Sequence, residues 1–561
     1  MNNQGSSLTY FLTIILVQTL SFSWDAIVPP RVKAALNPEL KIGVVQRFGS
    51  ELTDELNISS TEGDMLTIEY LGGDLQPRTL TTDEVTLEIS QTPFREPVLT
   101  ERLVLSNHAT FETAEESALQ WQAKGIEVEV TQPERWQVWA KRDVYKTPLL
   151  RRLLLDNLKS QGYATPYLET EILEQNTVVS FVLDGYRYNR RGLKITSSNR
   201  QFNVSKGENS RRSYLYNGTL QIQPNAYGNF TLVNNVALET YLRGVVPHEI
   251  GAGAPYNAIK AQSILARTYA LRNLRRFRAD NYELCATTHC QVYFGTKDAT
   301  ENTDRAITET RGLVLTYNSE LVDALYSSTT GGVTANFSDI WNGEERPYLN
   351  PVIDSPNLVW NLAQKSLAQE ENFRSFISLE EGFNETEVPS GKRLFRWNRY
   401  TSLERANQDL QNYIKKANHP LGSFNTITNM EVTERSLSGR VLKMHVQTDK
   451  GEVILEKNEA RSAFAPPLST LFYVEPVYEE PEKQEIDPDK QIESETIVIP
   501  NPELKGFNFI GGGFGHGVGM SQYGSYNLGK LGWLPEQILQ FYYPGTTIKP
   551  LDSSIVFYPE D

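Results

Sequence analysis

Short stretches of alternating apolar and polar residues recur along this chain, and this pattern predicts β-strands. Two of them, Lys41 to Val45 and Met65 to Tyr70, stand between Gly and Asp residues near the start. The pattern returns between residues 177 and 246, and again at 427–446 and 452–455. We therefore expect an α+β fold with a mostly antiparallel β core, because short strands joined by turns tend to pair with their neighbours.

Residues 38–170 are predicted to form an accessory region, which begins β-rich and then changes pattern. The later part reads as helix, strand, strand and helix, at residues 114–124, 125–130, 136–139 and 148–161. This order predicts a compact α/β unit. The order is similar to that of the SPOR peptidoglycan-binding repeat, although an unrelated α/β spacer could have the same order of helices and strands.

The longest helical pattern runs from Pro255 to about Phe277. Its apolar residues recur three and four positions apart, at 258, 261, 265 and 269, which predicts one buried stripe. Lys260 and Arg267 are seven positions apart and therefore share a face of the helix. We expect this central helix to lie beside a substrate cleft, with both basic side chains lining it.

Glu249 closes the segment Val-Val-Pro-His-Glu just before this helix. Pro247 biases Val246 toward an extended conformation, so we expect a strand to end there and Glu249 to lie on a strand-to-helix connection. Such connections commonly display catalytic groups, although an arbitrary Glu is more often a helix cap or a solvated acid. Apolar neighbours disfavour the charged carboxylate, which would raise its pKa toward general-acid use.

Composition and charge exclude some functions. The 561 residues allow roughly two to four domains, and 54 basic against 69 acidic residues give a net charge of −15. We expect no nucleic-acid partner, since phosphate binding needs a basic surface. An acidic, proline-bearing stretch at 479–495 predicts a solvated loop.

An apolar run from Leu8 to Phe22 has the length of a signal-peptide core and is short for a membrane span. No Lys or Arg precedes it, so an uncleaved anchor or a buried first element are alternatives. We expect residues 1–23 to be a signal peptide or an N-terminal anchor, and the protein to be exported.

The two cysteines of the chain, Cys285 and Cys290, have His289 between them. Three such ligands this close could bind zinc, with a fourth from elsewhere or from water. In an oxidising compartment the same cysteines could instead form a disulfide. Because His289 stands directly beside Cys290, we favour zinc.

A glycine-rich segment, Gly511 to Gly524, carries His516, Ser521 and Gln522. Glycine lets a ligand approach the main chain closely, so this segment predicts a site floor. Glycine runs are often linkers, but linkers rarely carry Phe, His, Met and Tyr. A hydroxyl-rich loop further upstream, Ala324 to Thr334, is followed by Trp341, whose ring could stack on a sugar.

Together these motifs resemble the stage II sporulation protein D family, also called the SpoIID/LytB or amidase-enhancer family. Four stretches match in order: Val245 to Glu249, Ala258 to Ala270, Cys285 to Tyr293 and Gly515 to Gly524. The resemblance covers about residues 175–550, which we expect to form one domain that carries the acidic loop.

The resemblance implies a peptidoglycan lytic transglycosylase. It places Glu249 on the catalytic glutamate, Lys260 and Arg267 on cleft positions, and the cysteine segment on the metal site of some members. Most glycosidases use two carboxylates. Here one glutamate would act as acid and base on the bond between MurNAc and GlcNAc and leave a 1,6-anhydro product. We expect sugar contacts from Trp341, His516, Ser521 and Gln522.

The family also implies an alternative, because some relatives are described as amidase enhancers. The protein would then bind the cell wall without catalysis and stimulate an N-acetylmuramoyl-L-alanine amidase. Glu249 together with Lys260 and Arg267 favours the enzyme. Either role implies peptidoglycan glycan strands as the partner and a bacterial periplasm or cell envelope as the location.

Overall fold

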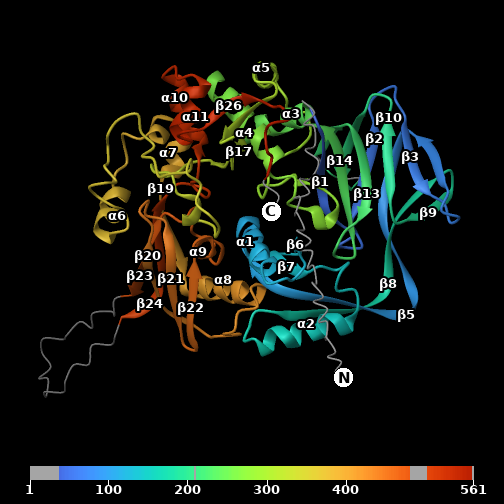
Figure 1. Cartoon of the computed structure of the whole chain (residues 1–561), viewed down its shortest axis with the longest axis horizontal. Coiled ribbons are helices and arrows are strands. Elements are labelled where there is room, and N and C mark those ends of the chain that lie inside the picture. The colour runs from blue at the N-terminus through green and yellow to red at the C-terminus, as the bar shows by residue number, and fades with distance from the viewer. Residues whose placement is uncertain (1–36, 208–209, 211, 480–501, 559–561) are drawn as a thin grey trace, which may run out of the picture.

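The computed structural model describes residues 37–207, 210, 212–479 and 502–558, which form an α+β fold (Figure 1). Most strand pairs are antiparallel, so the expected fold class is confirmed. The predicted signal or anchor segment, residues 1–23, and nearly all of the acidic stretch lie outside the described residues. None of the helices in the described ranges is long and apolar enough to cross a membrane.

Two sheets, antiparallel except where β15 runs parallel to β1, contain most of the first part of the chain. The first has the order β15-β1-β14-β13-β10-β3-β4. Its strands are β1 (Glu39–Phe48), β3 (Leu66–Leu71), β4 (Pro77–Thr82), β10 (Leu193–Ser197), β13 (Thr219–Pro224), β14 (Phe230–Ala237) and β15 (Leu284–Cys285). Alternate residues such as Ile42, Ile68 and Ile195 point into the core that both sheets share.

The second sheet has the order β12-β11-β2-β5-β7-β6, and β8 pairs with both β5 and β9. Its strands are β2 (Glu55–Ser60), β5 (Glu84–His108), β6 (Val128–Thr131), β7 (Trp136–Ala140), β8 (Tyr167–Leu183), β9 (Tyr186–Arg190), β11 (Gln201–Lys206) and β12 (Ser213–Asn217). The strands β5 and β8, of 25 and 17 residues, run side by side for most of their length.

A compact α/β unit is inserted between the two long strands. Helix α1 (Phe111–Gln122), β6, β7 and helix α2 (Pro148–Ser160) follow one another between β5 and β8, which confirms the predicted order of elements. We call residues 109–166 the inserted unit. Helix α1 buries Ala114, Ala118 and Trp121, spaced four and three apart, against its sheet. The likeness of this unit to a SPOR repeat stays a prediction.

The strand pairing does not follow the predicted boundary between residues 38–170 and 175–550. Strand β1 lies between β14 and β15, and β3 pairs with β10. Strands from both sides of the boundary therefore form one sheet. The sequence pattern reveals strands but not which distant strands pair, and these partners are far apart along the chain.

Helices gather in the middle of the chain and near its C-terminus. They are α3 (Leu238–Glu249), α4 (Tyr256–Arg272), α5 (Glu301–Glu309), α10 (Gln522–Lys530) and α11 (Pro535–Tyr542), with β16 (Leu313–Tyr317), β17 (Glu320–Leu321) and β26 (Thr547–Pro550) as a small sheet. The long central helix α4 is confirmed, but its predicted single stripe is wrong. Every residue from Ala261 to Arg272 is buried, because helices and β16 surround it.

The remaining segment packs around two smaller hydrophobic clusters, which we together call the second core. Its elements are α6 (Glu370–Ile377), α7 (Pro389–Phe395), α8 (Leu403–Lys416), α9 (Asn458–Ser462), β19 (Arg396–Ser402), β20 (Ile427–Arg435), β21 (Val441–Thr448), β22 (Gly451–Glu456), β23 (Phe472–Glu479) and β24 (Glu503–Gly512). The strands predicted at 427–446 and 452–455 are confirmed as β20, β21 and β22. Strand β25 (Met520–Ser521) then pairs with β18 (Tyr326–Ser327).

Candidate functional site

A cleft of about 610 Å³ lies where the inserted unit, the helices and the second core meet. Glu249, Tyr326, Gln522, His516 and Trp341 line it from the helical and glycine-rich parts. The inserted unit contributes Thr110, Phe111, Glu112 and Trp136, and helix α9 contributes Asn458, Arg461 and Ser462. A groove of about 950 Å³ lies elsewhere, along β5 and β8, and its Arg142 and Arg151 are paired with acidic residues.

Glu249 is the last residue of helix α3, not part of a strand-to-helix connection. The predicted strand end at Val246 is wrong, because the helix continues through Pro247. Packing of α3 against α4 and α5 outweighs the local bias of the proline. Ile250 then caps the helix, and Gly251 turns the chain with a positive φ of 80°.

Two hydrogen bonds hold the Glu249 carboxyl group in place. The backbone N–H of Val292 donates to Oε1 at 2.7 Å, and the Gln522 amide donates to Oε2 at 3.4 Å. Burial raises the pKa of Glu249 to about 7, although the bonds from Val292, Gln522 and Tyr326 act to lower it. Near neutral pH this carboxyl group can therefore both donate and accept a proton.

His516 and Trp341 form an aromatic wall of the cleft, with their ring centroids 5.1 Å apart. The N–H of Val518 donates to Nδ1 of His516 at 3.0 Å, which leaves any ring proton on Nε2. Burial lowers the pKa of His516 to about 3, so its ring is neutral at physiological pH.

The glycines beside His516 serve close packing within the protein. Gly517 and Gly519 both have positive φ. A side chain at Gly517 would collide with the guanidinium of Arg440, and one at Gly519 with the carbonyl oxygen of Leu325. At these two positions it is therefore protein atoms, and not a ligand, that approach the main chain closely.

The prediction that Arg267 lines the cleft is wrong. Its side chain is fully buried, and its Nε and Nη2 donate to the Glu239 carboxylate, each at 2.8 Å. Lys260 is not among the cleft residues either, and its Nζ lies 3.3 Å from Glu309. Because nearly all of α4 is buried, the shared face of these residues packs against protein and not against a groove.

Ser521 is also structural. It caps helix α10 by accepting a hydrogen bond from the N–H of Gly524 at 3.0 Å, and its hydroxyl donates to Glu385 at 3.0 Å. It is fully buried and absent from the cleft, so its predicted sugar contact is wrong. Its neighbour Gln522 does reach the cleft.

Behind Ser521 lies a fully buried pair of acidic residues, Glu385 and Asp354, which sequence reasoning missed. The hydroxyl of Thr330 contacts both, at 2.8 Å from Glu385 and 3.1 Å from Asp354. Burial and the charge of Asp354 raise the pKa of Glu385 well above its usual range. This pair therefore anchors the start of α10, and with it Gln522, through a protonated carboxyl group.

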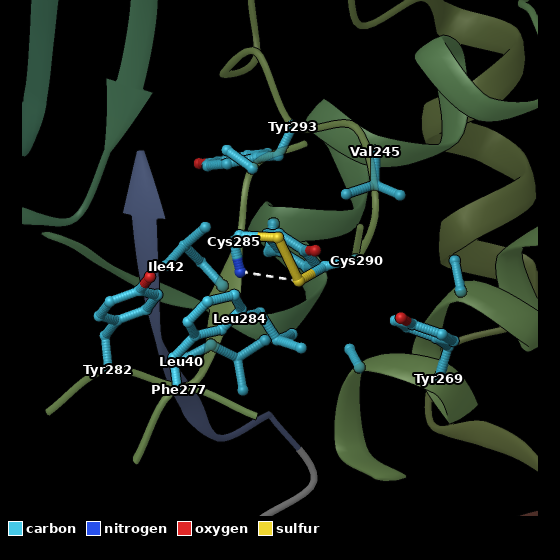
Figure 2. Packing of buried hydrophobic residues seen from close by; sticks show 14 of the residues in the cluster. Leu40, Ile42, Val245, Tyr269, Phe277, Tyr282, Leu284, Cys285, Cys290 and Tyr293 are labelled. Atoms are coloured by element: carbon cyan, nitrogen blue, oxygen red, sulfur yellow. Dashed lines mark hydrogen bonds between the residues drawn. A yellow bond between two sulfur atoms is a disulfide. The ribbon is translucent and has the colours of Figure 1, made fainter. Parts of the chain in front are cut away.

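Cys285 and Cys290 are joined in a disulfide (Figure 2). It is packed among Leu40, Ile42 and Leu284, and the N–H of Cys285 contacts the sulfur of Cys290 at 3.0 Å. Neither sulfur is available as a thiolate ligand, so the residues do not fit the predicted zinc site. Among the described residues, no group of three or more His, Cys, Asp or Glu side chains could hold a metal ion.

Tyr326 and Arg461 are further cleft residues that sequence reasoning missed. Tyr326 belongs to the hydroxyl-rich loop at residues 324–334, and the composition of this loop is the sequence signal that could have identified it. Its hydroxyl accepts a hydrogen bond from Gln291 at 3.0 Å and faces Glu249. Arg461 lies on a helix of five residues and belongs to no motif.

Comparison with known proteins supports the family resemblance of the sequence. Residues 226–317 match the family model described as stage II sporulation protein, and residues 335–519 match a model described as a domain of unknown function. The sporulation model covers three of the four motifs, those between Val245 and Tyr293, and confirms the resemblance over this segment.

Three relatives are similar over more than half of the chain. The amidase enhancer of Bacillus subtilis is 28% identical over 321 residues, which are 55% of this chain but only 40% of that protein. Stage II sporulation protein D of B. subtilis is 26% identical over 342 residues, 58% of this chain and 78% of that protein. An uncharacterised protein of Brachyspira hyodysenteriae is 24% identical over 320 residues, which are 56% of this chain and 68% of that protein.

Replacing the buried Arg267 should lower the free energy of unfolding far more than replacing the partly exposed Lys260. Arg267→Ala leaves the carboxylate of Glu239 largely buried and without its partner. We therefore expect the free energy of unfolding to fall by about 3–5 kcal/mol. Lys260→Ala breaks a partly exposed pair and should cost at most about 1 kcal/mol. Urea unfolding of both variants measures this. Equal losses would contradict the structural role of Arg267.

Thiol titration should find no free cysteine in protein purified and unfolded without reductant. We expect Cys290→Ser to lower the free energy of unfolding by about 2 kcal/mol, the value for a short closed loop. Two free thiols together with one zinc per chain would contradict the disulfide.

Stability should fall as the pH rises from about 5 to about 8 because of Glu385. Its raised pKa keeps it protonated in the folded state, whereas the unfolded chain loses that proton near the ordinary pKa. The stabilising effect is thus present at low pH and lost as the pH rises. Glu385→Gln should flatten this dependence in thermal unfolding, and exposed Glu387→Gln should not. A steep decline that survives in Glu385→Gln would reject this explanation.

Proposed function

We propose that this protein is a peptidoglycan lytic transglycosylase in which Glu249 is both acid and base. The observation that carries the proposal is the position of Glu249: a buried carboxyl group with a pKa of about 7, held by two hydrogen bonds in a cleft with an aromatic wall. A pKa close to the working pH suits a group that must give up a proton and then take one back.

The reaction needs one carboxyl group. Protonated Glu249 gives its proton to the oxygen between MurNAc and GlcNAc as the bond to C1 of MurNAc breaks. The 6-hydroxyl oxygen of the same sugar bonds to C1, and its proton goes to the Glu249 carboxylate. One glycosidic bond is exchanged for an internal one, and no water is consumed.

The charges around the cleft favour this over a two-carboxylate mechanism. Among the described residues that line it, Glu112 is the other carboxylate, and Arg276 binds it in an ion pair. Glu112 is therefore engaged already and poorly suited to attack a sugar or activate water. The hydrogen bonds from Val292 and Gln522 hold the Glu249 carboxyl group in one orientation, which reduces the cost of reaching the reactive geometry.

We further propose that the protein acts in the periplasm or cell envelope of a bacterium, with glycan strands as its partner. A disulfide is typical of an oxidising compartment outside the cytoplasm. The name of one relative, amidase enhancer, supports a second candidate function, in which the cleft binds glycan and the protein stimulates a cell-wall amidase without cleaving.

Glu249→Gln should lower the rate of glycan cleavage by about 100- to 10,000-fold, the usual contribution of a general acid. Incubation of purified protein with glycan strands, followed by mass spectrometry of anhydro products without any amidase present, measures it. Wild-type activity should decline above about pH 7, because Glu249 loses the proton that it must donate.

The matched control is Glu309→Gln, which removes a carboxylate outside the cleft and should leave the rate unchanged. Full activity of Glu249→Gln would remove Glu249 from the mechanism. No anhydro product from the wild type, combined with stimulation of an added amidase, would favour the second candidate function.

A further inference from the structure

The loop that carries Trp341 continues into Asn342, where three parts of the molecule meet. The N–H of Asn342 donates to Oγ1 of Thr113, on helix α1 of the inserted unit, at 3.3 Å. Its side-chain Oδ1 accepts a hydrogen bond at 2.8 Å from Nζ of Lys457, the residue before α9. Asn342 itself is exposed. The side-chain amide is therefore held in place by the second core and is still open to water.

The chain contains two Asn-Gly pairs, Asn217-Gly218 and Asn342-Gly343. Asparagine is thermolabile in such a pair, because the next backbone nitrogen can attack the side-chain Cγ and glycine has no Cβ to obstruct it. The N–H of Gly218 donates to the carbonyl oxygen of Arg200 at 2.8 Å. The N–H of Gly343 has no hydrogen-bond partner among the described residues. Only the second pair therefore has its attacking nitrogen free.

Lys457 is placed to promote an attack on Asn342. Its backbone has a φ of 50° and a ψ of −123°, a conformation that is unfavourable for a residue with a side chain and persists only where the surroundings impose it. Its Nζ also donates to the carbonyl oxygen of Trp341 at 3.0 Å, which fixes the ammonium group over the loop. An attack on Cγ places negative charge on Oδ1 of Asn342. A positively charged donor that already contacts Oδ1 stabilises this charge without moving.

We propose that Asn342 is a site of self-modification, at which Gly343 supplies the nucleophile and Lys457 stabilises the charge that develops on Oδ1. The backbone nitrogen of Gly343 bonds to Cγ of Asn342. The proton of its N–H passes through water to the side-chain nitrogen, which leaves as ammonia, and a succinimide ring remains. Water then opens the ring at one carbonyl to give aspartate, or at the other to give isoaspartate. The reaction uses no reagent except water, and the inference does not depend on the proposed function.

Both products change the wall of the cleft. Isoaspartate adds a methylene group to the main chain directly after Trp341, whose ring packs against His516 with the centroids 5.1 Å apart. Either product also places a carboxylate beside Nζ of Lys457 where a neutral amide stood, so the contact becomes an ion pair. Because the released ammonia is lost, the change occurs once in each molecule and accumulates as the protein ages.

The test incubates the full-length protein in water enriched in heavy oxygen, once folded and once in urea. Mass spectrometry of its peptides then measures the uptake of heavy oxygen at each asparagine, and an isoaspartate-specific methyltransferase detects the isoaspartate product. In the folded protein we expect Asn342 to react about 10-fold faster than Asn217, since the hydrogen bond of Gly218 must break first. In urea the two asparagines should react at similar rates.

Variants at Lys457 test its part in the reaction. Lys457→Met should slow the modification of Asn342 in the folded protein by about 10-fold, the value of one hydrogen bond from a charged group. Lys457→Arg keeps a charged donor and should retain part of the rate. Lys450→Met, the same change at an exposed position, should leave the rate unchanged. In urea all of these proteins should react alike, because the effect comes from the folded position of Lys457.

Each remaining outcome overturns a stated part of the proposal. No heavy oxygen at Asn342 in the folded protein, or equal rates at Asn342 and Asn217, overturns the modification site. An unchanged or faster reaction in the Lys457→Met protein overturns the role of Lys457. A cross-linked peptide that joins residues 342 and 457 shows that Nζ of Lys457 attacked Cγ itself, and it overturns Gly343 as the nucleophile. None of these results depends on whether Glu249 cleaves a glycan.

Discussion

Nearly complete burial of helix α4 is the constraint on which the site depends. Helices α3, α5, α10 and α11 all pack against it. Because α3 ends at Glu249 and α10 begins at Gln522, one shared support sets the distance between these two side chains. Burial also requires that the charge of Arg267 be neutralised inside the protein, which Glu239 does. Arg267, although it is charged and lies on the central helix, therefore has a structural role.

Buried carboxyl groups have two different uses in this protein. Glu249 is desolvated but open to the cleft, so its proton can be exchanged with a ligand. Glu385 is desolvated and sealed, next to a second acid, and its oxygen accepts the hydrogen bond from Ser521 that holds the glycine-rich segment. The same physical cause, loss of water around a carboxylate, gives a reactive group in one place and an anchor in the other.

Local patterns predicted local structure well. The elements of the inserted unit and the strands β20 to β22 were predictable, because neighbouring residues determine their periodicity. The pairing of β1 with β14 was not, because it joins residues nearly two hundred positions apart. Glu249 was identified by its motif, but its helix was missed, since packing outweighed Pro247.

Side-chain roles that depend on distant partners were harder to predict. Arg267 has the residue type of a substrate contact, and only the position of Glu239 reveals that it is internal. The cysteine spacing allowed either metal or disulfide, and only the pairing of the sulfurs distinguishes them.

The place of β1 between β14 and β15 has a consequence for shortened versions of the protein. A chain that begins near residue 226, where the match to the sporulation family starts, lacks β1 and β13, the two neighbours of β14. Strand β14 would then present bare N–H and C=O groups beside apolar side chains, an arrangement that promotes aggregation. The smallest soluble unit containing Glu249 therefore has to begin before β1.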